Sequence, residues 1–137
     1  MKLKTQSGQS AVEFALVLPL LLILLLGILE FGLVLYDKAV ITNAAREGAR
    51  AGVVAMNPRP TLGDAEQVAR DYCQAYLVTF GPNNLQVYAT PTAAGAAALQ
   101  VTVKYDYGWL TLQRLISVLN RDYNPLHLSA TSTMKYE

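Results

Sequence analysis

Glu13 is the residue whose position most suggests chemistry, because it is a carboxylate at the start of a long apolar run. The sixteen residues from Phe14 to Leu29 carry no formal charge, and after Glu30 the apolar pattern resumes as far as Tyr36. The run is therefore long enough to cross a bilayer as one helix. A carboxylate costs about 2.5–3.5 kcal/mol at the bilayer centre and less near its edge. Glu13 thus either pairs with a positive charge or lies at the level of the lipid headgroups.

The sequence offers few other groups for catalysis or metal binding. It contains one histidine and one cysteine, and it has neither a Gly-rich phosphate loop nor a clustered acidic pair. His127 falls in a strand pattern and points away from Leu126 and Leu128, which indicates a solvent-facing or hydrogen-bonded role. Cys73 cannot form an internal disulfide, and its place near the apolar face of a helix predicts burial. We expect no enzymatic activity, no cofactor and no metal.

The segment before the apolar run resembles a prepilin-type (class III) signal. A short leader bearing Lys2 and Lys4 is followed by Gly8, and Glu13 comes five residues after that glycine. The sequence G-Q-S-A-V-E-F-A-L-V-L-P from Gly8 to Pro19 is similar to the TadE-like family of minor pilins and pseudopilins, which belong to tight-adherence (Tad, type IVc) pilus systems. The sequence N-A-A-R-E-G-A-R-A at 43–51, and the segments at 101–107 and 130–137, also resemble that family.

The resemblance implies a function and a set of partners. A prepilin peptidase would cut between Gly8 and Gln9, although Gln9 departs from the apolar first residue that is usual after such cleavage. Glu13 and Phe14 would act in assembly, with Glu13 attracting the new terminal amine of a neighbouring subunit and fixing the axial register. The implied partners are the peptidase, other pilins or pseudopilins, an inner-membrane assembly platform and the lipid bilayer.

The resemblance also implies a location. The chain would cross the inner membrane once, with its N-terminus in the cytoplasm and its head in the periplasm, or outside the cell once it is in a pilus. The charges alone do not decide this orientation, because Lys2 and Lys4 are balanced by Lys38, Arg46 and Arg50 beyond the run.

A different interpretation treats the apolar run as a plain anchor or a secretory signal. A removable secretory signal needs a small-x-small site just after a short apolar core, and none follows residues 27–36 closely. An uncleaved inner-membrane accessory protein, whose periplasmic head binds another envelope component, remains the alternative function. It differs from the pilin hypothesis in retaining residues 1–8.

The run predicts one long helix over residues 9–56, crossing the membrane to about residue 36. Pro19 removes one backbone hydrogen bond and predicts a kink. Glu30 marks the far interface, contacts a partner helix or lies in a bundle, and the interface is favoured. Ala44, Gly48 and Gly52 recur every four residues, so they share one face where a second backbone approaches closely. That face serves the chain's own head in preference to a subunit contact.

Residues 57–137 predict a small head, and the fold class is α+β. A helix over 64–78 is expected, capped by Asp64 with Gln67 in a capping box. Alternating residues predict strands at 85–90, 99–107 and about 126–135 in an antiparallel sheet, and residues 109–119 predict a short helix that touches the head, the membrane or a partner. Tyr105, Tyr107, Tyr123 and Tyr136 belong either to the core or to a surface for partners.

Composition and charge agree with a small anchored protein. The 137 residues carry a net charge of +1, and removal of Lys2 and Lys4 leaves nine basic against ten acidic side chains. No basic stripe is present to follow a nucleic-acid backbone, so no nucleic-acid partner is expected.

Overall fold

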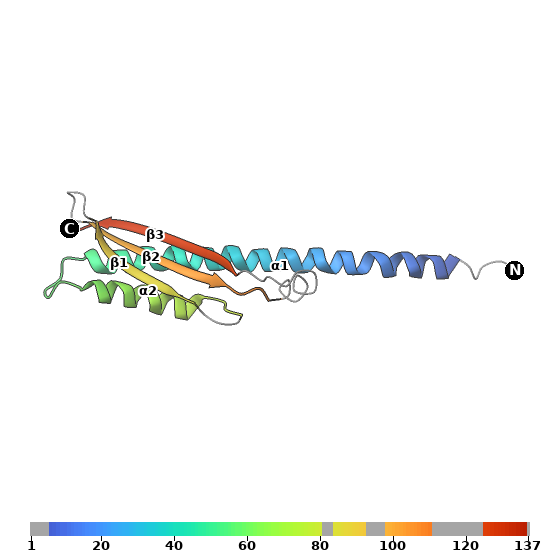
Figure 1. The fold of residues 1–137 in the computed structure, drawn as a ribbon, viewed down its shortest axis with the longest axis horizontal. Helices are drawn as coiled ribbons and strands as arrows, with labels where there is room; N and C mark the ends of the chain where they lie inside the picture. Colours follow the sequence, from blue (N-terminus) through green and yellow to red (C-terminus); the bar gives the residue numbers. More distant parts are fainter. Residues whose placement is uncertain (1–5, 81–83, 93–97, 111–124, 137) are drawn as a thin grey trace.

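The long apolar run and the residues that follow it form a single helix. The computed structural model describes residues 6–80, 84–92, 98–110 and 125–136, and helix α1 occupies Gln6–Val53. Pro19 lies inside α1 without ending it, since a proline removes only one hydrogen bond of the helical ladder. In Figure 1 the N-terminal part of α1 projects alone from the head, while its C-terminal part runs along the head.

Helix α2 (Leu62–Tyr76) lies beside the C-terminal part of α1 and begins earlier than the sequence predicted. Its N-cap is Thr61, whose hydroxyl accepts from the Asp64 backbone N–H, while the Asp64 carboxylate accepts from the Thr61 N–H at 2.7 Å. The prediction that Asp64 caps this helix with Gln67 as its reciprocal partner was therefore wrong. Thr61 takes the cap because Asp64 stands three residues after it, and Gln67 instead donates to Asp71.

In the described part of the head, three antiparallel strands form a sheet in the order β1-β2-β3. They are β1 (Gln86–Thr92), β2 (Ala98–Tyr107) and β3 (Leu126–Lys135). Val103 of β2 lies opposite Val87 on one side and Ala130 on the other. The α+β class and the three-stranded antiparallel sheet are thus confirmed. The predicted helix over 109–119 falls almost entirely outside the described residues.

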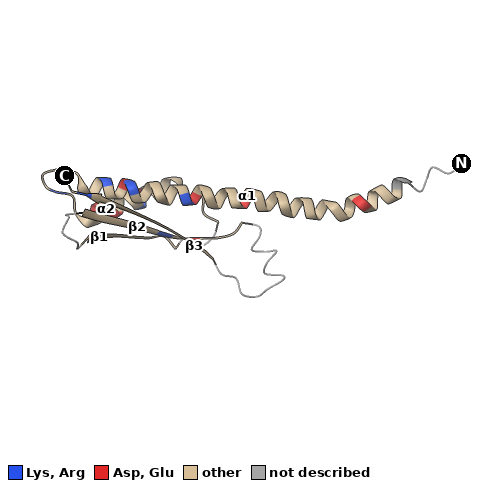
Figure 2. Cartoon of the chain, turned by 90° about the horizontal axis from the view of Figure 1, so that it is seen from above, with Lys and Arg blue, Asp and Glu red and all other residues tan. Residues whose placement is uncertain are grey.

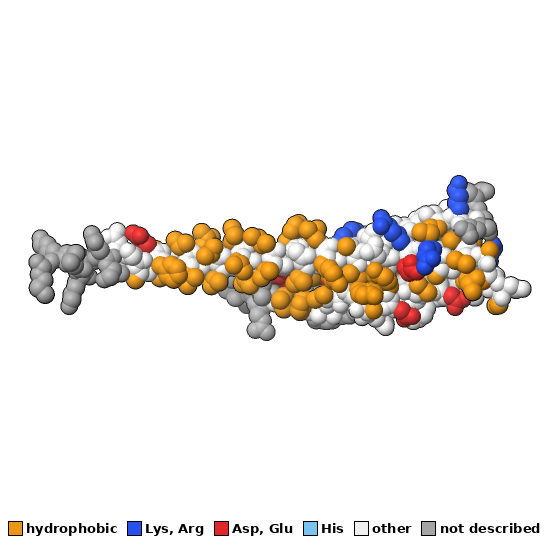
Figure 3. Space-filling view, turned by 180° about the vertical axis from the view of Figure 1, so that it is seen from behind, with side chains coloured by type: hydrophobic (Ala, Val, Ile, Leu, Met, Phe, Trp, Pro, Cys, Tyr) orange, Lys and Arg blue, Asp and Glu red, His pale blue; other side chains and the backbone are white. Residues whose placement is uncertain are grey.

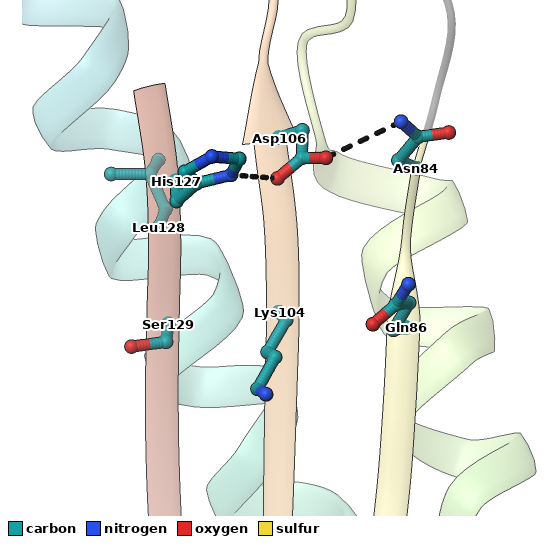
Figure 4. Close-up of a pocket in the computed structure, with 7 residues that line it drawn as sticks. All are labelled: Asn84, Gln86, Lys104, Asp106, His127, Leu128 and Ser129. Carbon is teal, nitrogen blue, oxygen red and sulfur yellow. Dashed lines mark hydrogen bonds and ion pairs between the residues drawn. The ribbon is translucent and has the colours of Figure 1, made fainter. Parts of the chain in front are cut away.

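The core lies between the two helices and one face of the sheet. Alternate residues of β2 are buried against α1 and α2, namely Leu99, Val101, Val103, Tyr105 and Tyr107. The intervening residues face away from the helices, as Figure 4 shows for Lys104 and Asp106. The head therefore has two layers, and the outer face of its sheet is polar.

Both edge strands of the sheet are contacted by side chains from the helices. On β1, the Val87 carbonyl accepts from Arg70 and the Ala89 N–H donates to Glu66 at 2.9 Å, both side chains coming from α2. On β3, the Ser129 carbonyl accepts from the Lys38 ammonium of α1. Side chains from both helices thus engage the backbone groups that an edge strand would otherwise present to another chain.

Candidate assembly and anchoring site

The N-terminal half of α1 is an uncovered apolar cylinder. Nearly every described side chain from residue 8 to residue 29 is exposed, including Phe14 at 63%. Within the described chain, α1 is the one helix that is long and apolar enough to cross a membrane. The most apolar segment of α1 has no buried residues. Figure 3 shows the apolar side chains along this projecting part. The chain therefore has the form of a single-pass membrane anchor.

Glu13 lies near the start of this cylinder, on the helix and away from the head. Its carboxylate accepts a hydrogen bond of 3.1 Å from the Gln9 side chain one turn earlier. Gly8 is helical as well, and a Cβ built on it would meet nothing within 4 Å. The structure thus brings Gln9 and Glu13 together on one helical face, and Gly8 adjoins them with open space around it.

Two further carboxylates of α1 accept hydrogen bonds from backbone N–H groups of the head, and only Glu30 had been singled out from the sequence. Glu30 is 2% exposed and accepts from the Leu110 backbone N–H, and Asp37 is fully buried and accepts from the Val78 N–H at 3.1 Å. Since they are seven residues apart, they lie on one side of the helix two turns from each other. The four- and three-residue spacing of Glu30, Val34 and Asp37 could have placed Asp37 on the same helical face as Glu30, but it did not show that this face is buried.

The small residues of α1 face the small residues of α2. Ala44 is fully buried, and a Cβ built on Gly48 would lie 2.7 Å from the Ala65 carbonyl oxygen and 2.9 Å from the Ala69 Cβ. At Gly52 it would lie 2.9 Å from the Ala65 Cβ. These separations are shorter than real Cβ contacts, so the two helices pack at a distance that only glycine permits.

Cys73 continues the small row of α2, and it is buried as predicted. Burial, with a smaller contribution from the charge of Asp37, raises the pKa of the Cys73 thiol to about 11. The pKa of Tyr105 is raised to about 12, first by burial and then by Asp37 and Tyr107. Both groups are therefore neutral at physiological pH, and Tyr105 and Tyr107 belong to the core.

The outer face of the sheet carries a shallow cavity of about 420 Å³. Its polar centre is Asp106, with His127 Nδ1 2.5 Å from one carboxylate oxygen and Asn84 donating to the other (Figure 4). The interaction with His127, followed by that with Asn84, lowers the pKa of Asp106. His127 is 66% exposed at its side chain, so this pair is a solvated cross-strand contact.

Neither this cavity nor any other described part of the chain offers a metal centre. Among the described residues, no group of three or more His, Cys, Asp or Glu side chains is placed to hold a metal ion. The arrangement on the outer face of the sheet is one histidine–carboxylate contact, with amide, hydroxyl and lysine side chains around it.

Comparison with known proteins points to the helix and not to the cavity. A family model described as TadE-like protein matches residues 8–50. No curated protein and no solved structure matches the chain. The matched range begins at Gly8, includes Glu13 and the apolar cylinder, and ends within the part of α1 that contacts α2. The resemblance to the TadE-like family is therefore confirmed over this range.

Proposed function

We propose that this chain, which is TadE-like over residues 8–50, is a structural minor pilin or pseudopilin of a Tad-type pilus. A prepilin peptidase cuts it between Gly8 and Gln9, and the mature subunit is stored in the inner membrane before assembly through α1. Its N-terminus faces the cytoplasm and its head the periplasm until the subunit joins other pilins on an inner-membrane platform. The protein performs no chemistry of its own.

The observation that carries this proposal is the uncovered cylinder of α1 headed by the Gly8–Glu13 segment. A helix that only completed a soluble core would be covered along its length, whereas residues 8–29 are exposed and the head begins at Glu30. An apolar helix of this kind is stable in lipid before assembly and among the helices of other subunits after assembly.

Glu13 has a specific role in this proposal. Cleavage after Gly8 would leave Gln9 as the first residue, and its new amine would carry a positive charge. Glu13 would attract the terminal amine of an adjacent subunit, which compensates a carboxylate that is otherwise costly among apolar helices. The pairing fixes the axial position of one subunit relative to the next.

The test is the intact mass and N-terminal sequence of the protein from its native host. A chain that begins at Gln9 supports the proposal, and the same spectrum reports any methyl group on the new amine. A chain that still begins at Met1 contradicts processing and favours the anchored accessory protein.

A variant separates specific cleavage from general proteolysis. Gly8→Val introduces a branched side chain where the structure leaves open space, so it leaves the fold intact and obstructs only the approach of the peptidase to the backbone. We expect this variant to keep its leader. Gly27→Val, also in open space on the same helix, is the matched control and should be processed normally.

A further inference from the structure

An apolar collar surrounds the point where the head meets the projecting part of α1. We define the collar as Phe31, Leu35 and Tyr36 of α1 together with Trp109 and Leu110, which follow β2. The side chains of Phe31, Leu35, Tyr36 and Leu110 are 63%, 54%, 46% and 48% exposed, and Trp109 is partly buried with its ring edge-on to Tyr107. Large apolar side chains with this exposure are unusual in water when they adjoin one another.

Glu30 lies inside this collar and is almost completely buried. The hydrogen bond from the Leu110 N–H to the Glu30 carboxylate places residues 109–110 alongside this turn of α1. Val34, one turn further on, is buried as well. The end of the head nearest the projecting part of α1 therefore covers the Glu30 side chain, which interrupts the apolar run. The other sides of the helix at this level stay apolar and exposed.

Helix length places the collar at the edge of a bilayer. The charge-free residues 14–29 give about 24 Å at 1.5 Å per residue, which is shorter than a hydrocarbon core of about 30 Å. A helix that enters the core at Phe14 leaves it about twenty residues later, near Leu33. The first exposed charge beyond Glu30 is Lys38, so apolar exposure persists to Tyr36 and ends there.

We propose that the collar is a lipid-binding surface, through which the head rests on the membrane with Trp109 and Leu110 in the interfacial layer. The inference assumes the membrane anchoring of the proposed function, and it adds that the head itself contacts lipid. Lipid is favoured over a second copy or another protein because apolar exposure continues from the cylinder into the collar: Leu29 is 58% exposed and Phe31 is 63% exposed. Tryptophan and tyrosine are also the side chains that concentrate at membrane interfaces.

Contact between the collar and lipid explains how the apolar run of α1 can include Glu30. If the helix crossed the membrane alone, the Glu30 carboxylate would face acyl chains at the edge of the core, where an unshielded charge is unfavourable. The cover formed by Leu110 replaces that lipid contact with a backbone hydrogen bond. The bilayer then extends past Glu30 to the level of Tyr36 without contacting the carboxylate.

Trp109 provides the test, because it is the only tryptophan in the chain. The full-length protein is reconstituted in vesicles of phosphatidylcholine and phosphatidylglycerol that contain a lipid brominated either near the headgroup or near the bilayer centre. We expect the shallow quencher to remove most of the Trp109 emission and the deep quencher to remove little. We also expect iodide in the buffer to be a weak quencher.

Two variants make the result independent of how far Trp109 is shielded by its own chain. Trp109→Phe combined with Leu110→Trp moves the probe to the more exposed collar position and should be quenched at least as strongly. Trp109→Phe combined with Tyr88→Trp moves it to the outer face of β1, about 20 Å further along the strands from the collar. That control should respond to iodide and not to the brominated lipids.

The outcomes separate this inference from the proposed function. If the protein floats with the vesicles but both collar probes respond to iodide like the Tyr88 probe, the head does not touch lipid and the inference is overturned while anchoring stands. If the collar probes are shielded from iodide and from both lipids, another protein or a second copy covers the collar, which also overturns it. Failure to float with the vesicles would overturn the inference and membrane anchoring together.

Discussion

The two halves of α1 share one secondary structure and have opposite environments. In the uncovered half, residues 8–29, most side chains are apolar and nearly all are exposed. In the covered half, residues 30–53, nearly half of the residues are buried. Figure 2 shows the N-terminal half extending beyond the head, and acidic and basic residues concentrated on the other half. The same backbone thus serves first as a surface for lipid or other helices and then as the central helix of a folded head.

The glycines display this difference most directly. A Cβ built on Gly27 or Gly32 would meet nothing within 4 Å, while one built on Gly48 or Gly52 would collide with α2 or β2. Glycine disfavours a helix by about 1 kcal/mol relative to alanine. In the C-terminal half that loss is offset by the close approach of α2, and in the N-terminal half it is not offset within the chain.

The carboxylates differ in the same way. Glu13 accepts from the Gln9 side chain of its own helix, whereas Glu30 and Asp37 accept from backbone N–H groups of the head. A buried acceptor of this kind satisfies an amide that would otherwise lose its hydrogen bond with water. Glu30 and Asp37 therefore fix the position of the head along α1, whereas Glu13 stays exposed.

The largest expected effect comes from removing the carboxylate of the uncovered half. Glu13→Ala should leave membrane insertion intact and abolish incorporation into filaments or membrane complexes, because the terminal amine of the next subunit loses its partner. Incorporation is measured by the amount of the chain in sheared filaments and in cross-linked membrane complexes. Glu47→Ala is the matched control, since Glu47 only pairs with Arg50 on an exposed face of the covered half. Equal incorporation of both variants would refute the pairing role of Glu13.

The next effect concerns the glycines of the two halves. Gly48→Leu should lower the free energy of unfolding of the head by about 3 kcal/mol, because its side chain meets the Ala65 carbonyl and the Ala69 methyl of α2. Gly27→Leu should leave the stability of the head unchanged. Urea unfolding in detergent, followed through the emission of Trp109, measures both. A loss of similar size at Gly27 would mean that the uncovered half contributes to the fold of the head.

Much of this contrast was predictable from the sequence, for different reasons in each half. The cylinder follows from sixteen residues without a charge. The four-residue spacing of Ala44, Gly48 and Gly52 predicted a face that packs against the head, although it did not identify α2 as the partner. Strand alternation also located β2 and β3 to within a residue. These features depend on local periodicity, which the sequence displays directly.

What the sequence did not predict depends on contacts between distant residues. Asp37 looks like an ordinary polar residue just past the membrane, and only the approach of Val78 makes it a buried acceptor. Glu30 was assigned to the interface by its position in the run, while its cover by Leu110 requires a contact eighty residues away. The cap of α2 was misplaced because Asp64 and Thr61 are both good capping residues, and their reciprocal hydrogen bonds decide between them.

A smaller effect is expected from the cap of α2, which holds that helix against the covered half of α1. Thr61→Ala should lower the stability of the head by about 1 kcal/mol at neutral pH. The hydrogen bonds from Thr61 lower the pKa of Asp64, so the contribution of Asp64 is complete above the unfolded pKa of about 3.9 and is lost as the pH falls through the folded value.

The difference in the free energy of unfolding between the wild type and Thr61→Ala should therefore become smaller in acid. Amide hydrogen exchange should also rise in residues 40–53 of α1 and stay unchanged in residues 14–29, because only the covered half depends on α2. A uniform rise along α1 would show that the two halves open as one unit.

The smallest effect is a change in rate at Cys73, the only thiol in the chain. Since burial raises the pKa of Cys73 to about 11, almost none of the thiol is ionised at pH 7, and a thiol reagent reacts only when α1 and α2 separate. We expect very slow labelling in the wild type, a similar rate in Gly27→Leu and a faster rate in Gly48→Leu. Mass spectrometry of the labelled protein gives these rates. Labelling of wild-type Cys73 as fast as a free thiol would contradict this expectation. It would mean that the small residues of α1 and α2 do not stay packed together in solution. The contrast between the two halves of α1 would then rest only on the exposure of the N-terminal half.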